Sequence, residues 1–269
     1  MRFSFLLPLF LALGACSGEG SDVSSDEAAV VGGTAANDDH AVVALLVEGD
    51  RGTALCTGTF VSPHVVVTAA HCITNEMDDS VAEPSAVRIH THATITSNDA
   101  TLAVTAVHPH PQFTRRAVMI AGTFAPIHDV AVLRTVTAFS GAPLPFARSS
   151  FAPSVGSAVR LVGYGASSQE IGATIRLGGM GRRRALGSEV TSVDDLLFID
   201  DAGRDRGSCV GDSGGPVLGR IAGQESVIGI ISFSPTQICS GPAINARLDV
   251  AASFVEAEID AADPGFLSR

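Results

Sequence analysis

The chain has 269 residues, a formal net charge of −11 at pH 7 and 46% hydrophobic residues. This length suits one large all-β domain or two smaller ones, and the apolar content is ample for a buried core. The acidic balance argues against nucleic acid as the main partner, because phosphate binding requires an excess of basic side chains.

The first 29 residues differ in character from the rest. Residues 1–15 (MRFSFLLPLFLALGA) carry one positive charge and then a short apolar run, which predicts a signal peptide too short to span a membrane. The run ends in LGA before Cys16, which resembles the bacterial lipobox and implies that Cys16 is lipidated. The alternative is an ordinary signal peptide with an incidental cysteine. Residues 16–29 are Gly/Ser-rich and acidic, and are expected to form a flexible tether and propeptide.

From Val30 onward, short apolar runs rich in Val, Ile and Thr alternate with turn residues. They lie at 41–47, 54–61, 64–72, 86–92, 101–108, 130–136, 158–165, 183–193, 196–200, 215–219, 227–233 and 244–250. Such even spacing predicts an all-β barrel or sandwich. Residues 251–262 instead contain good helix formers, with apolar Phe254, Val255 and Ile259 near one face, and predict a helix. No linker interrupts this region, so residues 30–269 are expected to form one domain.

Five cysteines occur in the chain. If Cys16 carries lipid, Cys56, Cys72, Cys209 and Cys239 remain, an even number in an oxidising compartment. Their number by itself allows three pairings.

The stretch GDSGGP at 211–216 contains a candidate nucleophile, Ser213. It matches the G-x-S-x-G pattern that also marks the nucleophile elbow of α/β-hydrolases. Those enzymes place their histidine after the serine, whereas the last histidine of this chain is His128. The order of residues therefore argues against an α/β-hydrolase or a serine esterase of that kind.

A serine hydroxyl needs a neighbouring base, and that base is usually a histidine held in one tautomer by a carboxylate. His71 lies in TAAHC, at the end of an apolar run, and Asp129 heads the run in DVAVL. A carboxylate at such an apolar position needs a partner. The expected constellation is therefore His71, Asp129 and Ser213, in that chain order.

Four blocks in order resemble the signature of the trypsin/chymotrypsin-like serine proteases. They are VVGG at 30–33, TAAHC at 68–72, DVAVL at 129–133 and GDSGGP at 211–216, and the resemblance extends through GYG at 163–165 to about residue 262. It implies two six-stranded antiparallel β-barrels with a C-terminal α-helix, and endopeptidase activity on protein or peptide substrates. An alternative on the same fold is a non-catalytic binding or adhesion module.

The resemblance assigns roles residue by residue. Ser213 attacks the peptide carbonyl, His71 is the general base and then the general acid, and Asp129 orients His71. The backbone N–H groups of Gly211 and Ser213 form the oxyanion hole, and Ser232 supports Asp129.

The same resemblance implies the disulfides Cys56–Cys72 and Cys209–Cys239. It implies no cofactor and no metal. The acids at 76–79 fall where some relatives bind calcium, but they show no clear ligand pattern.

Specificity is expected from positions that match the family's primary pocket. The floor falls on Gly207, where the trypsin branch has an aspartate, and the walls fall on Ser234 and Ala243, beside Ser232. These small, uncharged residues imply a preference for small to medium apolar residues before the cut, rather than for Arg or Lys.

The VVGG block implies a zymogen. Cleavage after Ala29 would free the α-ammonium of Val30, which would pair with Asp212. Ala29 itself fits the expected pocket, so we expect cleavage by the enzyme itself or by a sister enzyme. The same cut would release an exported, lipid-anchored precursor from the cell envelope, because no cysteine between Cys16 and Val30 can hold the pieces together. The sequence gives no indication of oligomeric state.

Overall fold

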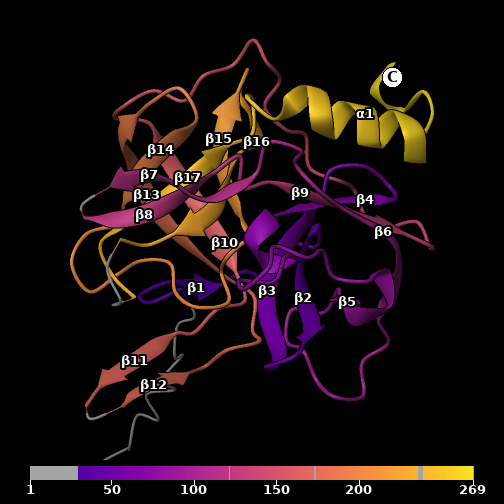
Figure 1. The fold of residues 1–269 in the computed structure, drawn as a ribbon. Coiled ribbons are helices and arrows are strands. Elements are labelled where there is room, and N and C mark those ends of the chain that lie inside the picture. The colour runs from indigo at the N-terminus through magenta and orange to yellow at the C-terminus, as the bar shows by residue number, and fades with distance from the viewer. Residues whose placement is uncertain (1–29, 121, 173, 236–238, 269) are drawn as a thin grey trace, which may run out of the picture.

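The structure is a computed structural model that describes residues 30–120, 122–172, 174–235 and 239–268. The predicted signal peptide (1–15), Cys16 and the tether (16–29) lie outside the described residues. Two β-barrels lie side by side, and a C-terminal helix covers one of them (Figure 1).

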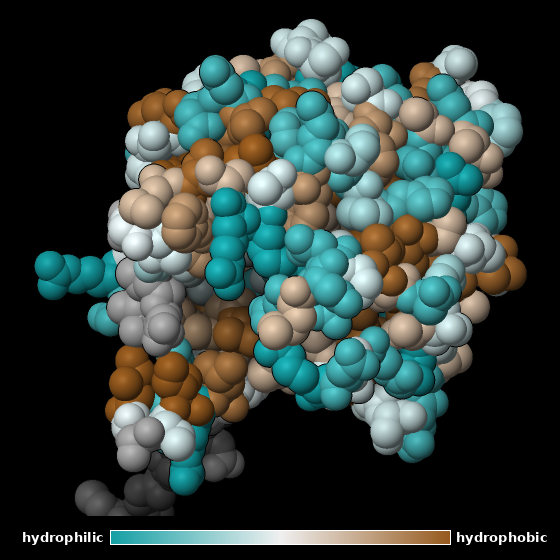
Figure 2. All heavy atoms as spheres, in the orientation of Figure 1, coloured by the Kyte–Doolittle hydropathy of each residue, from teal (hydrophilic) through white to brown (hydrophobic). Residues whose placement is uncertain are grey.

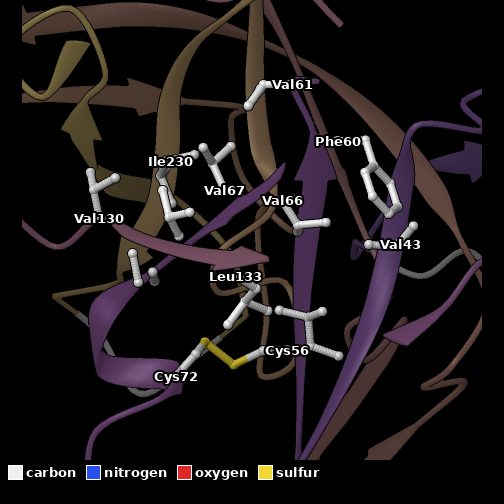
Figure 3. Close-up of a cluster of buried hydrophobic side chains, with 14 of the residues drawn as sticks. Val43, Cys56, Phe60, Val61, Val66, Val67, Cys72, Val130, Leu133 and Ile230 are labelled. Carbon is white, nitrogen blue, oxygen red and sulfur yellow. A yellow bond between two sulfur atoms is a disulfide. The ribbon is translucent and has the colours of Figure 1, made fainter. Parts of the chain in front are cut away.

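The first barrel is closed and antiparallel. In spatial order its strands are β2 (Val42–Gly49), β3 (Gly52–Phe60), β4 (Val65–Thr68), β9 (Ala131–Thr135), β6 (Leu102–Pro109) and β5 (Val87–His90). All four residues of β4 are buried, because one face lies inside the barrel and the other contacts the helix. Valines and a disulfide fill this core, as Figure 3 shows.

The second barrel is also antiparallel and six-stranded. It runs β13 (Arg184–Val193), β10 (Ala158–Gly163), β15 (Pro216–Ile221), β16 (Gln224–Phe233), β17 (Pro242–Arg247) and β14 (Leu197–Asp201). It closes because β14 pairs with both β17 and β13. The short strand β1 (Thr34–Ala35) adds to its outside through β13. The expected architecture of two six-stranded barrels is therefore confirmed.

The apolar runs found in the sequence correspond to these strands, with one difference that affects the site. The run at 64–72 leaves the sheet after Thr68 and continues as a 3₁₀ turn over Ala70–Cys72, with the Ile73 N–H donating to the Ala70 carbonyl. His71 therefore lies on this turn rather than at the end of a strand.

Two hairpins were not expected from the sequence. The first joins β7 (Thr114–Ile120) to β8 (Thr123–Ile127), and Ala125 of β8 packs with Leu197 and Ile244 of the second barrel. The second joins β11 (Ser168–Ile171) to β12 (Ile175–Gly178). Its tip exposes Ile171 and Ile175, and apolar atoms gather over this hairpin at the lower left of Figure 2. The residues of these four short strands are mostly exposed or half-buried, so the strands lack the buried periodicity that marks the barrel strands.

The predicted helix forms as α1 (Ala252–Ala262) and packs on the first barrel. Val255 and Ile259 are fully buried, and Phe254 packs edge-on against His110. Glu258 pairs with Arg134 of β9, which fixes the helix on the barrel wall. Among the described residues, no helix is long and apolar enough to cross a membrane.

A buried cation joins the two barrels. Arg183, only 1% exposed, donates from Nε to the Ala36 carbonyl and from Nη1 to both the Val42 carbonyl and the Tyr164 hydroxyl. A buried guanidinium without such acceptors would be strongly unfavourable. Arg183 is the second of three consecutive arginines in the sequence, and its contacts make it part of the interface between the barrels.

Candidate active site

His71 and Asp129 meet at the surface of the first barrel that faces the second. The Asp129 carboxylate accepts the His71 backbone N–H at Oδ1 (2.8 Å) and lies 2.7 Å from His71 Nδ1 at Oδ2. The first contact fixes the turn that carries the histidine, and the second sets its ring orientation. The disulfide Cys56–Cys72 ties the same turn to β3.

Asp129 is fully buried, and the Ser232 hydroxyl from β16 donates to its Oδ2 at 2.6 Å. Burial by itself would raise the pKa of this carboxyl, but His71 and Ser232 hold it below its ordinary value. Asp129 is therefore ionised at neutral pH. Such a carboxylate favours the His71 tautomer with its proton on Nδ1, which leaves Nε2 free to accept a proton.

Ser213 is brought to the same place from the second barrel. His71, Ser213 and Ser232 all line a cavity of about 280 Å³ between the barrels. Within the described part of the chain, the Ser213 hydroxyl makes no hydrogen bond. Contacts between nucleophile and base are often long before substrate binds, and tighten only in the complex.

The backbone around Ser213 requires glycine at the positions where the sequence has it. Gly211 has φ +99°, and a Cβ there would lie 2.8 Å from Gly165 Cα. Gly214 has φ +83°, and its Cβ would lie 2.3 Å from the Thr57 carbonyl oxygen. In the described residues, the N–H groups of Gly211 and Ser213 have no intramolecular acceptor. Two free donors beside a nucleophile suit an incoming oxyanion.

The expected pocket residues separate into two groups. Ser232 and Ser234 line the 280 Å³ cavity, whereas Gly207 and Ala243 are buried and are not among the residues that line it. A Cβ on Gly207 would lie 3.0 Å from Ser240 Cα, so the backbone packs closely there. Cys209 and Cys239, expected as a disulfide, also line this cavity. The sequence did not point to the other lining residues, which are Ser208, Val210, Ile231 and Phe233.

A larger cavity of about 460 Å³ lies on the other side of His71, between the β2–β3 turn and the loop after Cys72. The acids of this loop have partners, since Glu76 pairs with Arg51 and Asp79 with Arg115. No group of three or more His, Cys, Asp or Glu residues in the described ranges could hold a metal ion.

Val30 and Asp212 are both fully buried, Val30 in the apolar core of the second barrel and Asp212 next to Ser213 in the chain. Asp212 accepts the N–H groups of Gly165 and Cys209, each at 2.8 Å, and no cation contacts it among the described residues. Burial raises its pKa to about 7. Val30 is fully buried and has φ +50°, a strained conformation for a β-branched residue. The next residue, Val31, accepts the Gly207 N–H at 3.2 Å.

A second His–Asp pair has nearly the same geometry. Asp263, after α1, accepts the His64 backbone N–H at 2.9 Å and the Ser62 hydroxyl at 2.6 Å, and its Oδ1 lies 2.6 Å from His64 Nδ1. The Ser62 proton is therefore donated to Asp263 and not to His64. This pair fastens α1 to the β3–β4 turn, and it lines neither of the two cavities.

The two barrels, with a serine, a histidine and a buried aspartate at their junction, define a serine hydrolase of the two-barrel type. The sequence model of the family described as Trypsin matches residues 30–255. A trypsin of Saccharopolyspora erythraea is 29% identical over 203 residues, which is 70% of this chain and 81% of that protein. The chain therefore belongs to the trypsin family and is a serine endopeptidase that acts on protein or peptide substrates.

Both expected disulfides are confirmed, as Cys56–Cys72 and Cys209–Cys239. Together with the trypsin-family domain, they indicate an extracellular or exported protein.

Proposed function

We propose that the chain is the precursor of a serine endopeptidase in which Ser213 is the nucleophile, His71 the general base and acid, and Asp129 the carboxylate that orients His71. The observation that carries this proposal is the convergence of His71 and Ser213 on one cavity, with Nδ1 of His71 held by Asp129. The corresponding His64–Asp263 pair lines neither of the two cavities, and its neighbouring Ser62 hydroxyl donates to Asp263, so the pair serves as an internal comparison.

In the reaction, Ser213 Oγ forms a bond to the scissile carbonyl carbon while its proton passes to His71 Nε2. The oxygen of the tetrahedral intermediate accepts the N–H groups of Gly211 and Ser213. His71 then gives its proton to the leaving amine, and the acyl-enzyme forms. A water molecule then gives a proton to His71 Nε2 as it attacks the acyl carbon. The bond between that carbon and Ser213 Oγ breaks, the acid is released, and His71 returns the proton to Oγ.

The substrate preference proposed is for small to medium apolar residues before the cut. Apart from His71, every residue that lines the 280 Å³ cavity is uncharged. A basic or acidic side chain would therefore enter without a countercharge, at a large desolvation cost.

A peptide series that varies only this residue tests the preference. We expect kcat/KM for Ala or Val to exceed that for Arg or Asp by about tenfold or more, since a missing countercharge costs more than one decade. The matched control places the same substitutions three residues before the cut, where they should matter less. A kcat/KM that is highest for Arg would contradict the preference.

Activation is proposed to occur by cleavage between Ala29 and Val30. Three features support it: the buried position of Val30, its strained φ of +50°, and the carboxylate of Asp212, which has no cation partner among the described residues. Cutting the chain relaxes the constraint on φ at Val30 and creates an ammonium, and the proposed partner of this ammonium is the buried carboxylate of Asp212.

We propose further that the enzyme makes this cut itself, and that the cut releases it from a lipid anchor at Cys16. The signal peptide, Cys16 and the tether lie outside the described residues, so this part of the proposal depends on the sequence. Active enzyme that still carries its lipidated segment would contradict the coupling of activation to release.

Intact mass spectrometry of the protein expressed without residues 1–16 tests self-activation. We expect the wild type to begin at Val30 and the Ser213→Ala variant to keep residues 17–29, because the variant lacks the nucleophile. Incubating the variant with a trace of active wild type should then trim it to Val30. If both proteins begin at Val30 when expressed alone, another protease performs the cut.

A further inference from the structure

Thr57 reaches from the first barrel to the loop that carries the nucleophile. It lies in β3, next to Cys56 of the disulfide, and is fully buried. Its hydroxyl donates to the Gly211 carbonyl at 2.9 Å, and its backbone N–H donates to the Ser213 carbonyl at 2.8 Å. Thr57 therefore hydrogen-bonds to the carbonyl groups of both Gly211 and Ser213. These are the two residues whose N–H groups would bind the oxyanion.

The direction of the Thr57 hydroxyl proton is fixed. The Thr57 oxygen accepts the backbone N–H of Tyr164 at 3.1 Å, so its single proton is available for Gly211. Tyr164 is in turn held by Arg183 between the barrels. The chain of contacts thus links the barrel interface to the Gly211 carbonyl.

Gly211 is the part of the loop that most needs such a contact. With φ +99° and no side chain, its backbone has little intrinsic preference for one orientation. The hydrogen bond from Thr57 fixes its carbonyl, and the Asp212 N–H donates to the Cys209 carbonyl at 3.0 Å. The Val210 carbonyl, which shares a peptide plane with the Gly211 N–H, accepts the Ala166 N–H at 2.9 Å. Together these three bonds restrict rotation of the loop and of the Gly211 N–H.

The backbone of the nucleophile loop packs closely against Thr57. A Cβ on Gly214 would lie 2.3 Å from the Thr57 carbonyl oxygen, and one on Gly215 would lie 3.2 Å from its Cγ2. The backbone of the nucleophile loop therefore rests directly on Thr57, and the two glycines after Ser213 permit this approach.

We propose that Thr57 is a positioning residue for the oxyanion-binding loop, and that its hydroxyl keeps the Gly211 N–H aligned with the reacting carbonyl. The inference rests on the proposed role of Ser213 and of the Gly211 and Ser213 N–H groups. Thr57 does not touch the substrate. Its effect is transmitted through the Gly211 carbonyl and should appear in the transition state rather than in substrate binding.

The variant Thr57→Val keeps the shape of the side chain, keeps the backbone bond to Ser213 and removes only the hydroxyl. We expect kcat to fall by about 10- to 100-fold, which is somewhat less than the loss caused by removing an oxyanion donor outright. KM should change by less than about twofold. Affinity for a peptide aldehyde, which forms a tetrahedral adduct, should fall in parallel. Thr57→Ser restores a hydroxyl and should return kcat to within about threefold of the wild type.

Thr59 supplies the matched control. It lies two residues along the same strand, is equally buried, and its hydroxyl has no partner in the described structure. Thr59→Val should leave kcat within about twofold of the wild type. Rates are expressed per site labelled by a fluorophosphonate, so that misfolded protein does not count. If Thr57→Val does not fold, Thr57→Ala carries the same test.

A Thr57→Val variant with unchanged kcat, or with a loss confined to KM, overturns the positioning role. Equal losses of kcat in Thr57→Val and Thr59→Val overturn it as well, because the loss would then come from disturbed packing of β3 and not from the bond to Gly211. A wild type that takes up no fluorophosphonate overturns the proposed nucleophile itself, and this inference with it.

Discussion

Asp129→Asn is expected to lower kcat by about 10⁴-fold while leaving the fold intact. The side chain accepts a backbone N–H from His71 and a hydroxyl from Ser232, and it faces His71 Nδ1 at 2.7 Å. An amide of the same shape would turn its NH₂ group toward one of these partners. If it faces Nδ1, the ring must carry its proton on Nε2, and His71 can no longer accept the Ser213 proton.

The measurement is kcat for a small peptide ester or amide, with thermal unfolding to confirm the fold. Since the loss comes from the wrong tautomer, activity should recover partly at high pH, where hydroxide can take the serine proton directly. An Asp129→Asn enzyme within tenfold of the wild type at neutral pH would exclude the proposed role of Asp129.

The second His–Asp pair provides a control with nearly identical contacts. Asp263→Asn breaks the same kind of hydrogen bonds, to His64 and Ser62, but does so at the end of α1. We expect a loss of roughly 1–3 kcal/mol in stability, typical of a hydrogen bond to a charged group, and a kcat near that of the wild type. The two variants together separate disruption of a His–Asp pair from loss of catalysis.

Asp212→Asn is expected to affect the precursor and the mature enzyme in opposite directions. In the uncut chain, burial raises the pKa of Asp212 to about 7 from an ordinary value of 3.8. The folded precursor therefore binds this proton more tightly than the unfolded chain does. Its stability is unaffected by Asp212 below pH 4, falls as the pH rises from 4 to 7, and stays reduced above that range.

The variant Asp212→Asn should remove this dependence. The comparison is made in a Ser213→Ala background, which prevents self-cleavage. Between pH 4 and pH 8, the unfolding free energy of Asp212→Asn should increase by about 2–4 kcal/mol relative to that of its parent. Denaturant unfolding at several pH values measures it. Because all histidines are common to both proteins, their titration cancels. Parallel pH profiles would show that Asp212 is not a destabilising acid in the precursor.

In the mature enzyme the same substitution removes the partner of the proposed Val30 ammonium. Leaving one member of a buried ion pair uncompensated costs about 3–5 kcal/mol, which corresponds to a loss of about 10²- to 10⁴-fold in active enzyme. Activity of the wild type should also decline at alkaline pH, as the Val30 amine loses its proton. Full activity of mature Asp212→Asn, or a flat alkaline profile, would contradict the proposed switch.

The sequence by itself determined the class of fold and the residues at its junction. Repeated short apolar runs require β-strands with buried faces, and His71, Asp129 and Ser213 lie in blocks whose order is distinctive. The glycines at 211 and 214 in part reflect local demands, since each has a positive φ, although the close approach of Gly165 and Thr57 to them is tertiary. Such features are local in the chain, and a local pattern can be seen without knowing what lies beside it in space.

Only the tertiary structure decided which residues support the site from a distance. Thr57 is one of several threonines in a strand, and its contact with Gly211 spans 154 positions. Arg183 is one of three consecutive arginines, yet it is buried because the Ala36 and Val42 carbonyl groups converge on it. Val210 and Phe233 line the cavity beside Ser213 although they lie far apart in the chain, so the sequence did not single them out. These relations arise from the docking of two barrels, which brings together segments that no short pattern connects.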